Sequence, residues 1–379
     1  MTSLKILAAL AGVAVISIDL LDLVRALIVP RPHVGGIVAW SSRGLRRLYG
    51  ALAARRRTFG GRDAMLSAGE PLILLWRLLV WLALGLAGFG LIIWSVGRVG
   101  FEQSFVESGS SIFTLGIASE PGAVPSLVAF LAAGFGLVVV ALQIAYLPAL
   151  YDAFNRRETL VTLLESRAGT PAWGPELLAR HALVGIEGNL PRLYADWERW
   201  SADVAESHTT YPALLWLRSP HPTNSWVVSL VAVLDSAAML LALNPATAPP
   251  EARLAVRMGF TCLRDIARVI RIPFDADPMP DSPIGLPFGD FAAAVDRLGS
   301  AGMTTERTAA EAWPDFVGWR VNYEAIAYAL AARIDAPPGP WTGPRPHERE
   351  GLNPLRPIDR RPDQPEGTPA TRREPGPTG

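Results

Sequence analysis

The sequence contains almost none of the residues that form disulfides, metal cages or acid–base catalytic sites. Its 379 residues include a single cysteine, Cys262, and five histidines. One cysteine excludes both an intrachain disulfide and a metal site built from several thiolates. His181, His208 and His221 show no spacing typical of paired metal ligands, and no pair of nucleophile and base can be assembled. We therefore predict that the protein is not an enzyme and that it holds no cofactor.

An excess of charge of one sign is also lacking. The chain has 35 basic and 35 acidic residues, giving a formal net charge of zero, and the basic residues are nearly all arginine. Because no face is obviously basic, the sequence does not predict a nucleic-acid partner. It has no G-x-G-x-x-G after a strand pattern, so a nucleotide-sensing domain of the Rossmann type is not expected.

Long apolar stretches are what the sequence has in abundance. Half of the residues are hydrophobic and the mean hydropathy is +0.25, with the excess concentrated in residues 1–150. Residues 4–28, 70–95 and 125–151 are each long and apolar enough for a helix that spans a bilayer. The sequence therefore predicts an all-α membrane protein with three transmembrane helices, followed by a soluble helical region.

The N-terminal transmembrane helix, assigned to residues 1–29, carries three charged residues near its end. Asp19, Asp22 and Arg25 recur every three residues and therefore share one face of the helix. Charged groups in a membrane segment usually face protein or water. Two interpretations stay open: an ion-paired face that docks on the next helix near the cytoplasmic surface, or a role in ion sensing or gating.

Residues 30–69 form an arginine-rich connection in which Asp63 is the one acidic residue. Its eight arginines are Arg31, Arg43, Arg46, Arg47, Arg55, Arg56, Arg57 and Arg62. An excess of arginine in a short connection marks the cytoplasmic side, which places the N-terminus outside. A patch that binds anionic lipid is the alternative role for these arginines.

A short segment between the second and third apolar stretches is too polar to span the bilayer. Residues 108–119 read S-G-S-S-I-F-T-L-G-I-A-S, and residues 101–113 have the pattern of a short amphipathic helix. Such a segment at membrane depth is tolerated only where it is buried in protein or lines a water-filled path. A short helix followed by T-L-G between two spanning helices resembles the pore unit of potassium channels, and the resemblance covers residues 70–157.

The resemblance implies a selectivity filter in which backbone carbonyl oxygens replace the water shell of the ion. The family motif T-V-G-Y-G, usually followed by Asp, aligns with Thr114, Leu115, Gly116, Ile117 and Ala118, followed by Ser119. Gly116 permits the positive φ that aims carbonyls inward. Ala118 departs from the motif, and its Cβ would disfavour a left-handed backbone at the second glycine position. We expect K⁺, and through a wider filter also Na⁺, to permeate.

The connections around the short helix are acidic, with Glu102, Glu107 and Glu120 against Arg98 alone. Four copies around an axis would form an acidic vestibule that concentrates cations at the pore mouth. The alternative is that these are ordinary solvated charges, one of them at a helix N-terminus.

Residues 125–151 match the inner helix of the pore unit, and four of them are candidates for gating or pore lining. Gly134 and Gly136 lie at mid-helix, where the family often has a hinge, although close packing through small residues explains them equally well. Gln143 is a lone polar group that could face the pore, and Pro148 could bend the helix near its inner end.

The remaining chain is predicted to be a cytosolic helical domain over residues 158–335, followed by a disordered tail over residues 336–379 that is rich in Pro, Arg, Glu and Gly. The expected helices cover residues 158–167, 175–185, 191–208, 226–243, 250–270, 288–299 and 305–334. Residues 226–243 are apolar enough for a fourth span, but their length and Asp235 favour the centre of the bundle. Residues 146–158, Y-L-P-A-L-Y-D-A-F-N-R-R-E, resemble the end of the inner helix in a bacterial branch of channels with an all-helical C-terminal region.

Together these patterns predict a homotetrameric, potassium-channel-like protein of the cell inner (plasma) membrane that passes monovalent cations. Its partners are other copies of the chain and membrane lipid, its C-terminal domain is cytoplasmic, and the sequence names no ligand for that domain. The alternative is a non-conducting, membrane-anchored signalling or scaffold protein with a degenerate pore unit, for which Ala118 and Ser119 are the evidence.

Overall fold

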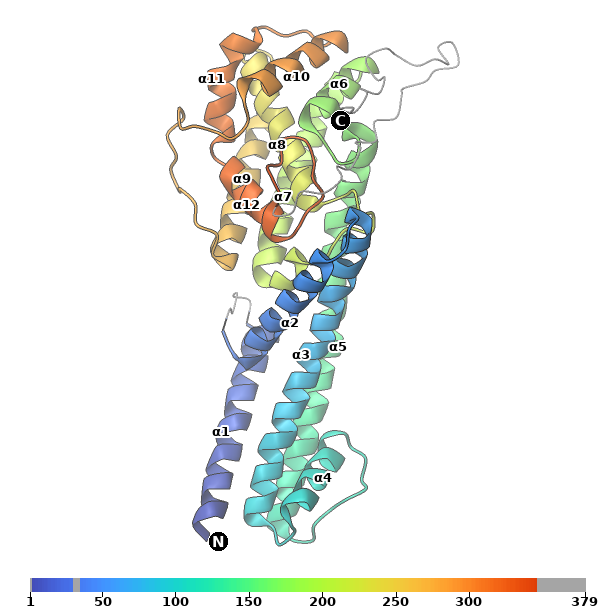
Figure 1. Cartoon of the computed structure of the whole chain (residues 1–379), viewed down its shortest axis with the longest axis vertical. Helices are drawn as coiled ribbons and strands as arrows, with labels where there is room; N and C mark the ends of the chain where they lie inside the picture. The colour runs from blue at the N-terminus through green and yellow to red at the C-terminus, as the bar shows by residue number, and fades with distance from the viewer. Residues whose placement is uncertain (1, 30–34, 346–379) are drawn as a thin grey trace, which may run out of the picture. The chain divides into compact units, whose positions relative to one another are not determined.

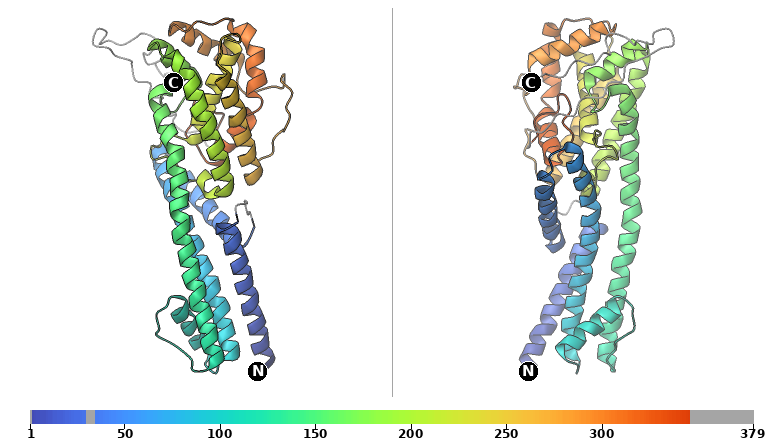
Figure 2. Two further views of the ribbon diagram at one scale, coloured as in Figure 1. Left: turned by 180° about the vertical axis from the view of Figure 1, so that it is seen from behind. Right: turned by 45° about the vertical axis from the view of Figure 1, so that its right-hand side comes forward.

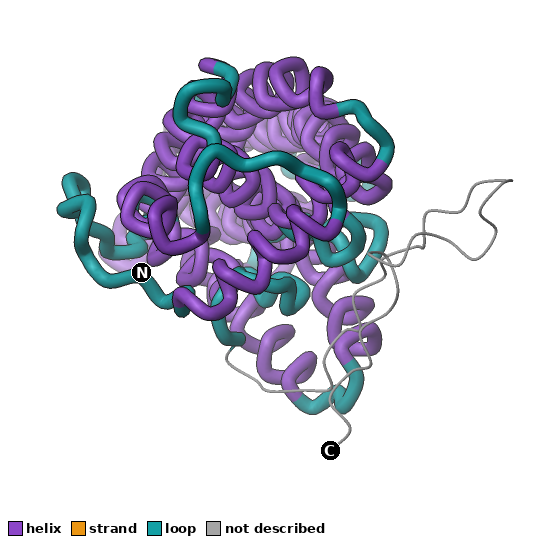
Figure 3. Tube along the Cα trace, turned by 90° about the horizontal axis from the view of Figure 1, so that it is seen from above, coloured by secondary structure: helices purple, strands orange, loops and turns teal. Residues whose placement is uncertain are grey.

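The computed structural model describes residues 2–29 and 35–345, which form helices and loops with no β-strand among them (Figures 1 and 3). The chain divides into two compact units. Residues 1–52 and 65–152 make up the N-terminal unit, and residues 53–64 and 153–379 make up the C-terminal unit. Residues 346–379 of the predicted tail, and Arg31 of the arginine-rich connection, lie outside the described residues.

The N-terminal unit is built from long apolar helices and one short one. Its helices are α1 (Thr2–Leu27), α2 (Ile37–Ala54), α3 (Phe59–Val96), α4 (Phe101–Ile112) and α5 (Ala123–Ala168), of which α2, α3 and α5 also extend into the C-terminal unit. In Figures 1 and 2, α4 lies beside the end of α3 and the start of α5.

Close contact between α1 and α3 depends on glycine. A Cβ atom on Gly12 would lie 2.6 Å from the carbonyl oxygen of Gly88, and one on Gly88 would lie 2.6 Å from Cγ1 of Ile16. Small residues let two helix backbones approach closely in a membrane, where packing drives association. Trp81, Phe89 and the other buried side chains of α3 then fill the space between α1 and α5.

Four helices are long and apolar enough to cross a membrane: α1, α3, α5 and α8 (Trp226–Leu243). The most apolar windows of α1, α3 and α5 are only 28%, 39% and 33% buried within the chain, whereas that of α8 is 94% buried. Three helices therefore expose apolar faces that a bilayer can cover, and α8 is enclosed by the protein itself.

Several helix boundaries differ from the sequence prediction. The predicted connection over residues 30–69 contains α2, and α3 begins at Phe59 with Pro71 inside the helix. Glu70, predicted to begin the outer helix, instead lies inside α3, where both of its carboxylate oxygens accept from Arg46 of α2, at 3.0 and 2.8 Å. The predicted inner helix and the following helix are one continuous helix, α5.

The C-terminal unit surrounds α8. Its other helices are α6 (Gly174–Leu183), α7 (Leu190–Thr210), α9 (Pro250–Ile270), α10 (Phe288–Ser300), α11 (Ala309–Arg320) and α12 (Glu324–Arg333). The prediction of one helix over residues 305–334 was wrong, because α11 and α12 are separated by a turn. That turn places Tyr323, which is fully buried, where its hydroxyl donates to Asp235 of α8 at 2.7 Å.

Two arginines without exposed surface organise the polar interior of this unit. Arg320 forms an ion pair with Asp235 and donates to the carbonyl oxygen of Trp341 at 2.7 Å. Arg157 of α5 donates to the carbonyl oxygens of Leu214 and Leu217 at 2.7 and 2.8 Å. It also contacts Nε2 of His208 at 3.1 Å, so this nitrogen of the imidazole is the acceptor.

The described part of the predicted disordered tail is packed instead. Ala336 and Thr342 are 2% exposed, and the ring of Trp341 lies 5.8 Å from that of Trp173 and 6.0 Å from that of Phe316. Trp341 supplies the large apolar surface whose burial offsets the entropy cost of ordering residues 336–345. The prediction of disorder was wrong for residues 336–345, because it was based on overall composition, to which a single tryptophan contributes little.

Candidate permeation segment

The short helix α4 is fixed between α3 and α5 by close contacts on both sides. Ser108 donates its hydroxyl to the carbonyl oxygen of Leu86 in α3 at 2.9 Å. On the other side, a Cβ on Gly136 of α5 would overlap the carbonyl oxygen of Ile112. The polar residues on the inner face of α4 are buried: Ser104, Glu107, Ser108 and Ser110. The observed bounds of α4 agree with the helix predicted over residues 101–113 to within one residue.

In the segment that follows α4, residues 114–118, backbone N–H groups donate hydrogen bonds to oxygen atoms of α4. Leu115 donates to the carbonyl oxygen of Ser110 at 2.8 Å. The N–H groups of Ile117 and Ala118 both donate to the hydroxyl oxygen of Ser110, at 3.0 and 3.1 Å. Among the described residues, no hydrogen bond ends on a carbonyl oxygen of residues 114–118. Apart from that of Gly116, the backbone N–H groups of this segment are therefore bound, whereas its carbonyl oxygens accept no hydrogen bond within the described chain.

The backbone conformation of the segment matches the prediction at one position and differs at two. Gly116 has a φ of 70°, in the left-handed region that glycine adopts without cost. Thr114 also has a positive φ, 54°, which the sequence did not predict. Ala118 is not among the described residues with a positive φ, so the strain expected from its Cβ does not arise.

The side chains of the segment are uncovered in a single chain. Leu115 is 59% exposed and Ile117 is 73% exposed, and Phe113 at the end of α4 is 50% exposed. These three exposed apolar side chains lie within five residues, and exposed apolar patches commonly mark a contact with another protein or with lipid.

Two of the three glutamates assigned to an acidic vestibule are buried within the chain. Glu107 is 2% exposed and accepts the N–H of Glu120 at 2.9 Å, while Glu120 is 7% exposed and accepts the N–H of Arg98. Neither is a solvated charge, because each carboxylate satisfies a backbone donor of a loop next to α4. Glu102 is exposed, in agreement with both interpretations of it.

The four candidate residues of the predicted inner helix differ in their contacts and in their burial. Gly136 is required by the close approach of Ile112, which favours packing over a hinge at that position, whereas a Cβ on Gly134 would meet nothing within 4 Å. Gln143 is buried among the helices of its own chain and does not face outward. Pro148 is exposed and lies inside α5 without interrupting it.

The charged residues of α1 dock on α3, but not through an ion pair. Asp22 accepts the indole N–H of Trp81 at 3.1 Å, while Arg25 is exposed. Asp19 has no exposed surface, and neither of its carboxylate oxygens has a hydrogen-bond partner in the described structure. No salt bridge joins Arg25 to either aspartate among the described residues, so the predicted ion pairing within this face was wrong.

The sequence analysis did not single out Ser110, whose hydroxyl holds the segment after α4. Its signal was available, because a serine four residues before Thr114 lies one helical turn back on the buried face of α4. Sequence spacing could not show that one hydroxyl would accept two N–H groups from a loop that has no regular structure.

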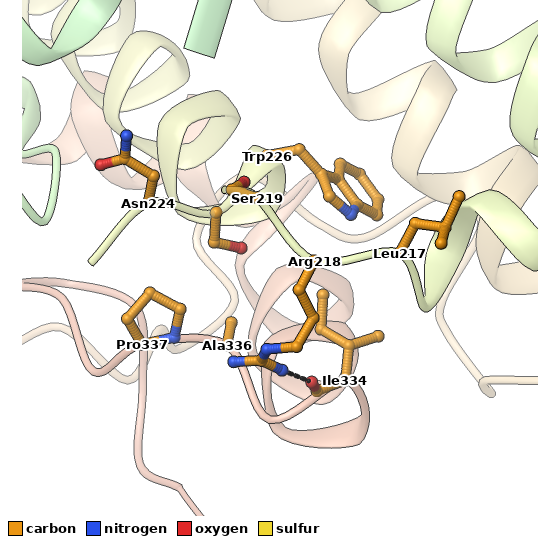
Figure 4. Close-up of a pocket in the computed structure, with 9 residues that line it drawn as sticks. Leu217, Arg218, Ser219, Asn224, Trp226, Ile334, Ala336 and Pro337 are labelled. Atoms are coloured by element: carbon orange, nitrogen blue, oxygen red, sulfur yellow. Dashed lines mark hydrogen bonds between the residues drawn. The ribbon is translucent and has the colours of Figure 1, made fainter. Parts of the chain in front are cut away.

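The C-terminal unit holds a small pocket, which Figure 4 shows. It is lined by Leu217, Arg218, Ser219, Asn224, Ser225, Trp226, Ile334, Ala336 and Pro337. Arg218 donates to the carbonyl oxygens of Ile334 and Asp335, both at 2.9 Å, and forms an ion pair with Asp63 of α3. Arg62 pairs with the carboxylate of Asp335. These contacts hold residues 53–64 within the C-terminal unit.

Comparison with known proteins finds no family model, no curated protein and no solved structure that matches this chain.

Proposed function

We propose that the chain is one subunit of a homotetrameric, potassium-channel-like channel for monovalent cations. The observation that carries this proposal is the division of backbone groups in residues 114–118. Apart from that of Gly116, their N–H groups are bound by α4, and their carbonyl oxygens accept no hydrogen bond among the described residues. A row of open carbonyl oxygens is what a dehydrated cation requires as ligands.

The electrostatics of α4 add to this argument. A helix carries a partial negative charge at its C-terminus, and α4 ends at Ile112, directly before the segment. Positive φ values at Thr114 and Gly116 turn successive peptide units and so let neighbouring carbonyl groups share a direction. Both features favour a cation over an anion at this place.

Assembly follows from the same segment, because one chain supplies only one set of carbonyl groups. The exposed side chains of Leu115 and Ile117 would be covered in a tetramer by lipid-facing helices or by the next copy. In this arrangement α4 and residues 114–118 surround a shared axis.

We place α1, α3 and α5 in the cell inner membrane as transmembrane helices, with the N-terminus outside. The exposed arginines at residues 55–57 mark the cytoplasmic side. α8 is the core of a cytosolic bundle in this arrangement, because amphipathic helices already cover its apolar surface. Membrane lipid would then contact α1, α3 and α5 only.

The C-terminal unit is attached to both helices of the pore unit, which suits a control domain. It holds the start of α3 through Asp63 and Arg218, and it holds the end of α5 through Arg157. Movement of this unit would therefore act on the outer and inner helices together.

The test is cation flux in liposomes that contain the purified full chain. Ser110→Ala leaves the N–H groups of Ile117 and Ala118 without their acceptor, at a cost of about 1–3 kcal/mol, and we expect flux to fall by about tenfold or more. Ser111→Ala is the matched control, since no hydrogen bond of its hydroxyl is present among the described residues. Gly116→Asp should abolish flux.

A non-conducting scaffold is the second candidate, and Ala118 favours it. A filter glycine is missing there, and the observed backbone does not require one. An intact tetramer with no flux at any voltage or pH would support the scaffold and end the channel proposal. Equal flux in the Ser110→Ala and Ser111→Ala variants would show that residues 114–118 are not the conducting segment.

A further inference from the structure

Asp19 of α1 differs from the other aspartates of the N-terminal unit. It has no exposed surface, and neither carboxylate oxygen has a hydrogen-bond partner in the described structure. Asp22 lies one helical turn further on and accepts the indole N–H of Trp81 at 3.1 Å. One face of α1 thus carries two buried carboxyl groups, of which that of Asp22 is bonded to α3 and that of Asp19 is unpartnered.

The charged groups of the surrounding helices leave Asp19 without a cationic partner. On α1, Asp22 acts on it as a like charge, Arg25 is exposed, and Lys5 donates to the carbonyl oxygen of Gly97 at 2.8 Å. On α3, the guanidinium of Arg77 lies over the ring of Trp81 at 5.3 Å.

The arginines of α2 are engaged elsewhere. Arg46 pairs with Glu70, and Arg43 donates to the carbonyl oxygen of Ala39 at 3.2 Å while its guanidinium lies over Trp40. No described arginine or lysine forms a salt bridge with Asp19.

An ionised carboxylate in this position would be both desolvated and unpaired. Such a charge costs several kcal/mol, and a group in this situation usually takes up a proton instead. Proton uptake forms one O–H bond on a carboxylate oxygen and leaves a neutral side chain. Acidic residues inside a membrane segment are rare and commonly mark functional sites.

We propose that Asp19 is a proton-binding site that controls the docking of α1 on α3. With a proton bound, the side chain is neutral and can stay buried while α1 keeps the close approach to α3 that Gly12 and Gly88 allow. Loss of the proton leaves a charge next to Asp22 in an apolar contact, and α1 separates from α3 to let water reach the carboxylate. This proposal goes beyond permeation, because it concerns the contact of α1 with α3 and applies to a channel and to a scaffold alike.

The experiment measures docking directly in the full chain, reconstituted in liposomes. Spin labels are placed at Leu7→Cys on α1 and Leu79→Cys on α3, both exposed positions, while the native Cys262 is buried and stays unlabelled. We expect the docked fraction to fall as the pH rises. The slope should approach a tenfold change in the docking equilibrium per pH unit, as for one proton.

Asp19→Asn keeps the shape of the side chain and cannot ionise. We expect it to stay docked at every pH, whereas the matched variant Asp22→Asn keeps the pH dependence. Infrared spectra should show a protonated-carboxyl C=O band that disappears in Asp19→Asn and persists in Asp22→Asn.

Three results would overturn the proposal. One is an unchanged pH dependence in Asp19→Asn, and another is the absence of the carboxyl band at all pH values. The third is docking that follows the concentration of Na⁺ or K⁺ at constant pH and is lost in Asp19→Asn, since a cation would then occupy the site instead of a proton.

Discussion

The two units of this protein differ in whether their strongly apolar helices are buried within the chain or exposed. α8 has the same mean hydropathy as α1 and α3 in its most apolar window, 2.2, yet that window is 94% buried against 28% and 39%. In the C-terminal unit the apolar helix is covered by helices with one polar face, such as α9. In the N-terminal unit the apolar faces stay uncovered, which is what a lipid environment requires. Hydropathy alone therefore did not distinguish a core helix from a membrane helix.

Polar groups buried in the two units also differ in how they are satisfied. In the C-terminal unit, Asp235 has both Arg320 and Tyr323 as partners. In the N-terminal unit, Glu107 and Ser110 accept backbone N–H groups, and Asp19 has no described partner at all. Buried polar groups thus stabilise the core of the C-terminal unit. In the N-terminal unit, some of them fix the conformation of a loop, and Asp19 is left without a hydrogen-bond partner.

The largest expected effect comes from breaking the buried ion pair of the C-terminal unit. Arg320→Met leaves Asp235 buried without its cation, and we expect a loss of about 3–5 kcal/mol in the free energy of unfolding. Denaturant unfolding of the full chain in detergent measures it.

The control for this variant is Arg268→Met, which removes an exposed pair with Asp265 and should cost less than about 1 kcal/mol. Similar losses in both variants would contradict the view that burial makes the Arg320 pair essential. The double variant Arg320→Met with Asp235→Leu should recover part of the loss, because the charge of Asp235 is removed. The recovery is incomplete, since Glu324, also buried, still loses its ion pair with Arg320.

A smaller effect tests whether α8 is a core helix. Leu234→Ala removes a side chain with no exposed surface that packs on Gly259, at an expected cost of about 2–5 kcal/mol. Leu131→Ala on α5 changes a side chain that is 58% exposed in the chain, and it should cost less than about 1 kcal/mol. If thermal unfolding shows equal losses of stability in the two variants, α8 is not a core helix in contrast to α5.

Arg218 tests the attachment of α3 to the C-terminal unit. Arg218→Gln removes the ion pair with Asp63 and two bonds to backbone carbonyls, for an expected cost of about 1.5–3 kcal/mol. Amide hydrogen exchange in residues 59–64 should become about 10–100 times faster. Arg307→Gln, which removes an exposed pair with Asp315, is the control and should leave that exchange unchanged.

The smallest effect is a pH dependence carried by His208. Burial, followed by the positive charge of Arg157, holds the pKa of His208 well below its usual value. The unfolded chain binds a proton near pH 6.5 and the folded chain does not, so stability falls as the pH drops below that value, by at most about 1.4 kcal/mol per pH unit.

His208→Gln should reduce the slope of the unfolding temperature against pH between about pH 6.5 and 5. The exposed His221 provides the control variant, His221→Gln, with an unchanged slope expected. An identical slope in the two variants would show that His208 does not carry this dependence.

Helix positions were largely predictable, because periodicity and proline signals are local. The predictions over residues 226–243 and 250–270 coincide with α8 and α9. Predictions failed where a distant contact decides the local structure. The pair of Arg46 with Glu70 lies across the junction of α2 and α3, and Tyr323 separates α11 from α12 by reaching Asp235.

The candidate site shows the same limit. The sequence placed a short helix and a T-L-G turn between two apolar helices, and Gly116 adopts the positive φ expected of it. It did not reveal that Ser110 binds two backbone N–H groups, nor that Glu107 and Glu120 are buried. Exposure and hydrogen-bond partners depend on which surfaces meet, and spacing along the chain carries no such information.

Residue type and local periodicity were enough to predict the long apolar helices, the arginine-rich connection and the helical character of the rest. The packing of the folded chain was needed to see that α8 is enclosed while α1, α3 and α5 expose their apolar faces. It also decided that Asp22 has a partner and Asp19 has none. The physical reason is that burial and hydrogen bonding are properties of pairs of surfaces, and those pairs form only when the chain folds.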